Sequence, residues 1–141
     1  MIKVKVKLNA DIALPLYQTA GSAGFDLASS EDITILAGQT VAVKTGLCLA
    51  IPEGYELQIR SRSGMALKHN VFVLNAPGTI DSDYRGEIMV ILSNAGSNYT
   101  IKKGDRIAQG VLKTYEQAEF EVVSTLDETA RAEKGFGSTG N

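Results

Sequence analysis

The sequence contains few residues of the types that build disulfides, metal clusters and membrane spans. Its 141 residues include one cysteine, Cys48, one histidine, His69, three prolines and no tryptophan. A single cysteine excludes an intrachain disulfide, which fits a cytoplasmic or other reducing intracellular compartment. A single histidine excludes a metal site built from several histidines. No apolar run approaches the roughly 20 residues of a transmembrane helix, so we expect no membrane partner.

The chain also lacks an excess of charge of one sign. It has 14 basic and 16 acidic residues, a net charge of −2, and 44% hydrophobic residues. A balanced charge argues against a nucleic-acid-binding surface, so we expect no direct nucleic-acid binding. The length and apolar content suffice for one folded core.

Apolar and polar residues alternate in short runs separated by glycines. In residues 1–8 the aliphatic residues and three lysines fall on opposite faces, and in residues 55–60 Tyr55, Leu57 and Ile59 alternate with polar residues. This period of two is typical of half-buried strands. Further strands are predicted at 32–36, 40–45, 47–51, 71–75, 87–93, 98–102, 106–113 and 119–123.

The best helix candidate is short and runs from Ser63 to Asn70, with Ser63 as its N-cap. A βαβ fold needs repeated helices of about 10–15 residues between strands, and the pattern lacks them. We therefore predict an all-β fold, a jelly-roll-like β-sandwich or barrel, for residues 1–123. Residues 124–141 have few aliphatic side chains and predict a flexible C-terminal arm.

Five segments concentrate the side chains suited to chemistry: residues 23–27 (AGFDL), 60–64 (RSRSG), 75–86 (NAPGTIDSDYRG), 104–109 (GDRIAQ) and 131–140 (RAEKGFGSTG). Arginines beside a helix start can bind phosphate, and a glycine-rich segment with Ser and Thr can form an anion nest. A hairpin edge in the third segment presents backbone donors and acceptors that can read a nucleobase. Together the segments indicate a polyphosphate nucleotide as ligand.

Several of these residues also have a purely structural interpretation. Asp26 can cap a turn, Asp105 follows glycine as turn residues do, and the alternation leaves the facing of Gln109 open. We interpret His69 as structural and Cys48 as a small core residue.

In this order and at these spacings, the five segments resemble the five motifs of the trimeric deoxyuridine triphosphate nucleotidohydrolases (dUTPases), over residues 23–140. The resemblance implies a β jelly roll that assembles as a homotrimer, with active sites shared between subunits. It implies hydrolysis of dUTP to dUMP and pyrophosphate with Mg²⁺, which keeps uracil out of DNA and supplies dUMP for thymidylate synthesis.

The resemblance also implies roles for individual residues. Asp81 would be the general base that activates the attacking water, and Asp26 would hold Mg²⁺ through coordinated water. The expected substrate contacts are Arg62, Ser63, Gly64 and Gln109 on the phosphates; Asn75, Gly78, Thr79 and Ile80 on uracil; Tyr84 and Met89 at the deoxyribose; and Arg131, Phe136, Gly137, Ser138 and Thr139 in an arm that closes over the nucleotide.

The fifth segment departs from the family pattern. Ala132 stands where glycine usually follows the arginine, and Lys134-Gly135 replaces a Gly-Gly pair. A stiffer arm is expected, because alanine has less backbone freedom than glycine.

Two alternatives remain at this point. One is a deoxycytidine triphosphate deaminase, which shares a related fold and would release ammonia rather than pyrophosphate. The other is a non-catalytic nucleotide-sensing trimer, against which the presence of Asp81 argues.

Overall fold

The computed structural model describes residues 1–135, so Phe136, Gly137, Ser138 and Thr139 of the predicted arm lie outside the described residues. Their expected roles therefore stay predictions. The elements of the described part are β1 (Lys5–Leu8), β2 (Phe25–Ala28), β3 (Ile33–Ile35), β4 (Thr40–Lys44), β5 (Leu47–Ala50), β6 (Tyr55–Arg60), α1 (Ser63–His69), β7 (Val71–Val73), β8 (Gly78–Ile80), β9 (Met89–Asn94), β10 (Tyr99–Ile101) and β11 (Arg106–Thr114).

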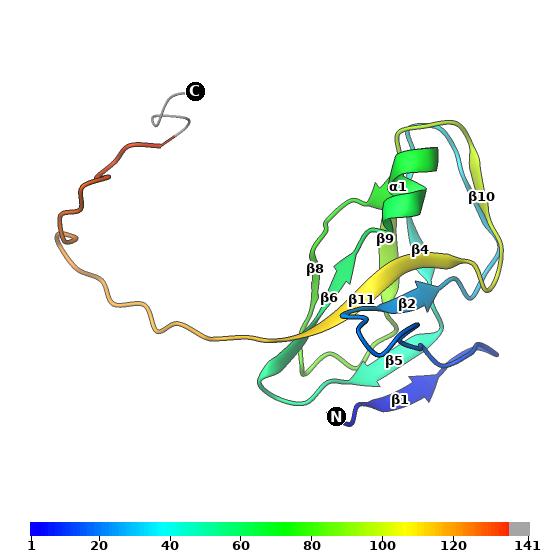
Figure 1. Cartoon of the computed structure of the whole chain (residues 1–141), viewed down its shortest axis with the longest axis horizontal. Helices are drawn as coiled ribbons and strands as arrows, with labels where there is room; N and C mark the ends of the chain where they lie inside the picture. The colour runs from blue at the N-terminus through cyan, green and yellow to red at the C-terminus, as the bar shows by residue number, and fades with distance from the viewer. Residues whose placement is uncertain (136–141) are drawn as a thin grey trace.

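The strands pair in an antiparallel manner and form two larger sheets, β2-β11-β6-β8 and β4-β9-β7, with the smaller pairs β1-β5 and β3-β10 (Figure 1). Both larger sheets contribute fully buried side chains to one core cluster, among them Leu27, Leu57 and Ile107 from the first and Val43, Val90 and Leu92 from the second. Two antiparallel sheets that share one core form a β-sandwich, as the strand pattern predicted.

The alternation of apolar and polar residues correctly predicts which face of β6 is buried, but it predicts the buried face of β1 at the N-terminus poorly. Leu57 and Ile59 of β6 are 1% and 3% exposed, as expected, and Cys48 of β5 is buried. In β1, by contrast, Val6 and Leu8 are 40% and 41% exposed. β1 lies at a sheet edge and pairs with β5 alone, so its apolar face is only partly covered.

The strand predicted at 119–123 is wrong for the described chain. β11 ends at Thr114, and residues 116–135 extend away from the body without helix or strand (Figure 1). Phe120 and Val122 are 92% and 99% exposed. A strand needs a neighbour for its backbone hydrogen bonds, and the described chain pairs none with this segment. The division of the chain at residue 123 remains a prediction.

Two strands form where the sequence indicated motifs or turns. β2 contains Asp26, and β8 follows the Pro77-Gly78 pair and joins β6 as the edge strand of its sheet. Proline and glycine signal a local turn, whereas the pairing with β6 depends on contacts far along the chain. Within residues 1–135, no helix combines the length and the apolar character needed to cross a lipid bilayer.

Candidate functional site

Asp26, Gln109 and Arg60 lie side by side on three neighbouring strands. Asp26 of β2 is opposite Gln109 of β11, which is opposite Arg60 of β6. Directly opposite residues project from the same face of a sheet. The neighbouring Leu27 is 1% exposed, so the pleat directs Asp26 away from the core. The register thus settles the facing of Gln109, which shares the outer face with Asp26.

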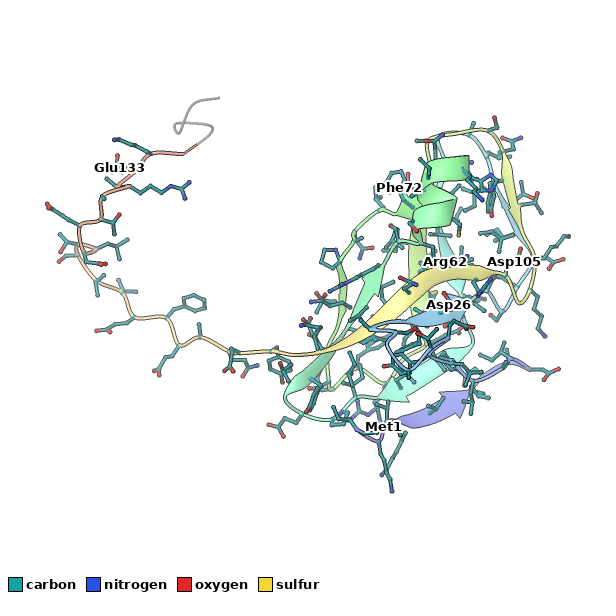
Figure 2. All side chains as sticks on the ribbon, viewed as in Figure 1. Met1, Asp26, Arg62, Phe72, Asp105 and Glu133 are labelled. Carbon is teal, nitrogen blue, oxygen red and sulfur yellow. The ribbon has the colours of Figure 1, made fainter. Side chains whose placement is uncertain are left out.

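Two arginines contact the Asp26 carboxylate. Its Oδ1 lies 3.4 Å from Nε of Arg62, and its Oδ2 lies 3.3 Å from Nη1 of Arg106. Arg62 Nη1 also donates a 2.9 Å hydrogen bond to the main-chain oxygen of Arg106. The Asp26 side chain is only 11% exposed. Figure 2 shows Asp26 and Arg62 together beside β11. The structure therefore unites two predicted residues and adds Arg106, which the sequence analysis missed.

Helix α1 begins directly after Arg62 and carries two further predicted phosphate contacts. Arg62 itself is the N-cap, and no side chain caps the helix, so the prediction that Ser63 is the N-cap is wrong: Ser63 is already the first helical residue. Ser63 and Gly64 are exposed, and a Cβ on Gly64 would meet nothing within 4 Å. The described chain therefore leaves open space next to Gly64, two residues after Arg62, and no neighbouring atom of that chain excludes a side chain there.

A cavity of about 300 Å³ lies beside β8. It is lined by Ala42, Thr79, Ile80, Asp81, Tyr84, Glu87, Met89 and Ile91. Five of these are predicted site residues, namely Thr79, Ile80, Asp81, Tyr84 and Met89. Because β8 is the edge strand of its sheet, its second edge offers backbone donors and acceptors to a ligand.

A tight turn after β8 positions the ring of Tyr84. The turn is closed by a 3.2 Å bond from the Tyr84 amide to the oxygen of Asp81, and the tyrosine hydroxyl donates to the oxygen of Glu87 at 2.9 Å. A Cβ on Gly86 would lie 2.6 Å from ring carbon Cζ of Tyr84, so any other residue at this position would displace the ring. Arg85 Nη1 donates to the oxygens of Ser82 and Tyr84 and braces the turn from within.

Asn75 lies against the start of β8. Its Nδ2 is 3.2 Å from the position that a Cβ on Gly78 would take. Glycine at this position allows the amide side chain to approach the backbone closely. The structure thus groups Asn75 with the residues predicted to read the base.

The residues around Asp26 and those around Asp81 form two separate groups of predicted site residues, called here the Asp26 half and the Asp81 half. Ile80 is opposite Leu57, so Asp81 follows at the Glu56 end of β6, whereas Asp26 aligns with the Arg60 end. From the strand rise and the spacing across four strands, Asp26 and Asp81 are roughly 19 Å apart. The cavity that contains Asp26 shares no lining residue with either of the two cavities that contain Asp81.

The residues around Asp26 suit Mg²⁺ only as an ion that is bound through water molecules. In the described residues, no group of three or more His, Cys, Asp or Glu side chains is placed to hold a metal. Mg²⁺ commonly keeps several waters and binds one or two carboxylates together with substrate phosphates. Asp26 offers one carboxylate, already contacted by two guanidinium groups, and this donor set fits contact through water.

The C-terminal segment does not bring Arg131 to either half. Arg131 Nε donates to the oxygen of Lys134 at 3.0 Å, and Ala132 adopts a left-handed backbone conformation with φ of 47°. Figure 2 places Glu133 far from Asp26 and Arg62. The alanine therefore occupies a conformation that favours glycine, at the position where the resemblance described above implies glycine.

Comparison with known proteins identifies relatives along nearly the whole chain. The family model described as dUTPase matches residues 10–140. The deoxyuridine 5'-triphosphate nucleotidohydrolase of Wolinella succinogenes is 57% identical, over 96% of this chain and 91% of the relative. That of Helicobacter pylori strain P12 is 52% identical, over 99% and 97%. None of these relatives is a deaminase, so the first alternative receives no support.

Solved structures agree with the family match. A mutant dUTPase of Staphylococcus bacteriophage 80alpha, solved with dUpNHpp, is 26% identical and covers 100% of both chains with a TM-score of 0.93. A mutant dUTPase from phage phi11 of S. aureus shares the fold at 23% identity and a TM-score of 0.83, over 88% of this chain and 98% of that one, and its structure concerns a structural Mg(II) ion. With the family model spanning residues 10–140 and relatives above 50% identity, the chain belongs to the dUTPase family.

Proposed function

We propose that the protein is an enzyme that hydrolyses dUTP to dUMP and pyrophosphate by cleaving the bond between the α- and β-phosphates. The observation that carries this proposal is the cavity beside β8, where Asp81 and Tyr84 lie next to the strand edge that pairs with no other strand of residues 1–135. Membership of the dUTPase family supports the same substrate. Removing dUTP would keep uracil out of DNA and supply dUMP for thymidylate synthesis.

The β8 edge would recognise the base, and Tyr84 the sugar. Backbone groups of Gly78, Thr79 and Ile80, together with Asn75, would hydrogen-bond uracil. A different base would leave such groups buried without partners, which discriminates strongly. Tyr84 and Met89 would line the deoxyribose and leave no room for a 2′-hydroxyl.

The chemistry would require positioning and charge neutralisation rather than a covalent intermediate. Asp81 would accept the proton of a water that attacks in line, while pyrophosphate departs. Arg62, Ser63, Gly64 and Gln109 would bind the phosphates. Asp26 would contact the waters of a phosphate-bound Mg²⁺, an ion that stabilises developing negative charge on the phosphoryl oxygens.

A homotrimer would join the two halves of the site. Asp26 and Asp81 of one chain are too far apart to act on one phosphate group, so the Asp26 half of one subunit would face the Asp81 half of another. The arm of a third subunit would bring Arg131, Phe136, Gly137, Ser138 and Thr139 over the nucleotide. The free, buried Cys48 is compatible with the cytoplasm or another reducing compartment.

The test is product analysis. The protein is incubated with Mg²⁺ and, in separate reactions, dUTP, dCTP, dTTP and UTP, and pyrophosphate and ammonia are measured. We expect pyrophosphate from dUTP alone at low enzyme concentration. Ammonia from dCTP would instead establish a deaminase, and nucleotide binding without either product would establish a sensor.

A further inference from the structure

Arg106 is held where the strand pattern alone would not place it. The register of β11 against β2 shifts between Arg106 and Ala108, which marks a β-bulge. Ala108 is fully buried, so regular pleating would direct Arg106, two residues earlier, into the core. The bulge instead pairs Arg106 with Ala28, two residues from Asp26 and on its face of β2. Bulges commonly redirect a side chain in this way beside active sites.

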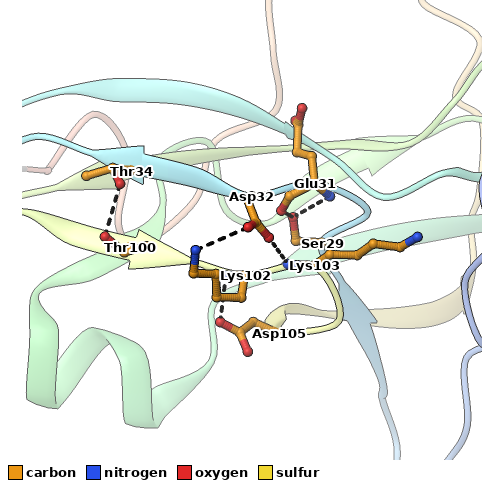
Figure 3. Close-up of polar contacts among 8 residues, drawn as sticks. All are labelled: Ser29, Glu31, Asp32, Thr34, Thr100, Lys102, Lys103 and Asp105. Carbon is orange, nitrogen blue, oxygen red and sulfur yellow. Dashed lines mark hydrogen bonds and ion pairs between the residues drawn. The ribbon is translucent and has the colours of Figure 1, made fainter.

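The loop that precedes Arg106 is fastened to the body at several points. Gly104 adopts a φ of 92°, and backbone bonds link Gly104 and Asp105 to Ser29, at 2.8 and 2.9 Å. Figure 3 shows two side-chain contacts of this loop: Asp105 accepts from the Lys102 amide at 2.9 Å, and Asp32 accepts from the Lys103 amide at 2.8 Å. The start of β11 is therefore a fixed base for the Arg106 side chain.

Arg106 then contacts two proposed site residues in different ways. Its guanidinium reaches the Asp26 carboxylate, and its main-chain oxygen accepts from Arg62 Nη1. Arg62 Nε contacts the other oxygen of Asp26, so the three residues form a closed ring. In this closed set of contacts Arg62 uses Nε and Nη1, and its Nη2 takes no part. The contacts therefore fix the orientation in which the Arg62 guanidinium can meet a phosphate.

We propose that Arg106 is a positioning residue for dUTP hydrolysis, which orients Asp26 through its side chain and Arg62 through its carbonyl. This proposal rests on the function proposed above. Arg106 acts through these two residues rather than on the nucleotide. A misplacement of about 1 Å at such a group can lower the rate about 10²-fold.

A double-mutant cycle tests the proposal. A substitution of Arg106 leaves the main-chain oxygen in place, so Arg106→Met removes only the contact with Asp26. We expect kcat to fall at least about tenfold in Arg106→Met, while the Kd for dUpNHpp in Mg²⁺ changes by less than about threefold. Adding Arg106→Met to Asp26→Ala should cause no further loss, because its partner is already absent. Arg106→Lys should restore part of kcat.

The matched control is Lys113→Met, which removes the same charge from an exposed position near the far end of β11. It should retain the kcat of the unmodified protein, and thermal unfolding should show that all variants fold. If the losses from Asp26→Ala and Arg106→Met multiply, or if Arg106→Met keeps normal kcat, the positioning role is overturned. An unmodified protein that leaves dUTP intact would instead overturn the proposed function.

Discussion

At the scale of single residues, Asp81 provides the sharpest test of the chemistry. The Asp81→Asn variant should bind dUpNHpp normally but lose roughly 10²–10⁴-fold in kcat, because an amide cannot take the proton of the attacking water. The turn should survive, since it uses the main-chain oxygen of Asp81, which hydrogen-bonds the Tyr84 amide. Steady-state kinetics with dUTP and calorimetric titration with dUpNHpp separate the two effects.

Asp83→Asn is the matched control for Asp81. Asp83 lies in the same acidic turn and shares a second cavity with Asp81, beside Glu53 and Glu56, but it does not line the cavity that contains Tyr84. Its kcat should stay within about twofold of the unmodified protein. Near-normal turnover in Asp81→Asn would make Asp81 a turn residue and remove the proposed base.

Two substitutions of Tyr84 separate the ring from the hydroxyl. Tyr84→Ala removes the ring that covers Gly86, so the preference for dUTP over UTP in kcat/KM should fall at least about tenfold. Tyr84→Phe keeps the ring and loses only the hydrogen bond to Glu87, so selectivity should persist while stability falls by about 1 kcal/mol. Equal selectivity in all three proteins would place the sugar discrimination elsewhere.

At the scale of elements, Asp32 links the start of β3 to the loop before β11. The amide of Lys103 and the ammonium of Lys102 both favour the charged carboxylate and lower the pKa of Asp32. A lowered folded-state pKa stabilises the fold above the usual aspartate pKa, and this contribution is lost as the pH falls through the lowered value. The contribution of this ion pair to stability is small because the side chains of Asp32 and Lys102 are both mostly exposed.

Asp32→Asn should therefore lower the Tm by about a degree or two at pH 7, and the difference should shrink below about pH 4. Differential scanning calorimetry across this range measures it. Asp127→Asn, an exposed aspartate in the extended C-terminal segment, controls for the change in net charge. A difference that grows on acidification would contradict the assigned direction of the Asp32 shift.

The left-handed turn at Ala132 predicts how a glycine at this position would change the activity. A left-handed conformation costs alanine about 1–2 kcal/mol, whereas glycine adopts it freely. If the closed arm fixes this turn and the free arm only samples it, Ala132→Gly should raise kcat/KM for dUTP about two- to fivefold without changing the Tm. Ala130→Gly, whose φ is not positive, is the matched control and should bring no gain. A reduced kcat/KM in Ala132→Gly would show that closure abandons the turn.

At the scale of the whole molecule, local sequence patterns predicted the β-sandwich. Pairings between residues far apart in the sequence determine which predicted strands form and which side chains meet. The alternation in 55–60 correctly placed Leu57 and Ile59 in the core. The same kind of alternation in 119–123 failed, because no strand of the described chain pairs with it. The contact of Arg106 with Asp26 spans 80 positions and depends on a bulge, for which the sequence carries no local signal.

The assembly is tested by mixing two variants that are inactive for different reasons. Asp26→Ala disables one half of the proposed site and Asp81→Asn the other. If the halves come from different subunits, a mixed trimer can unite an intact Asp81 half with an intact Asp26 half. Variants unfolded and refolded together in equal amounts should recover about a quarter of the activity of the unmodified protein, as random assembly around a threefold axis gives.

The control mixture combines Asp26→Ala with Arg62→Met, which disable the same half, since the two side chains contact each other. No assembly of these chains contains an intact Asp26 half, so mixing should restore nothing. Light scattering should give three times the mass of one chain for every mixture. Recovery in both mixtures, or in neither, would contradict a site divided between subunits, because only the first pair lies on opposite sides of the roughly 19 Å separation.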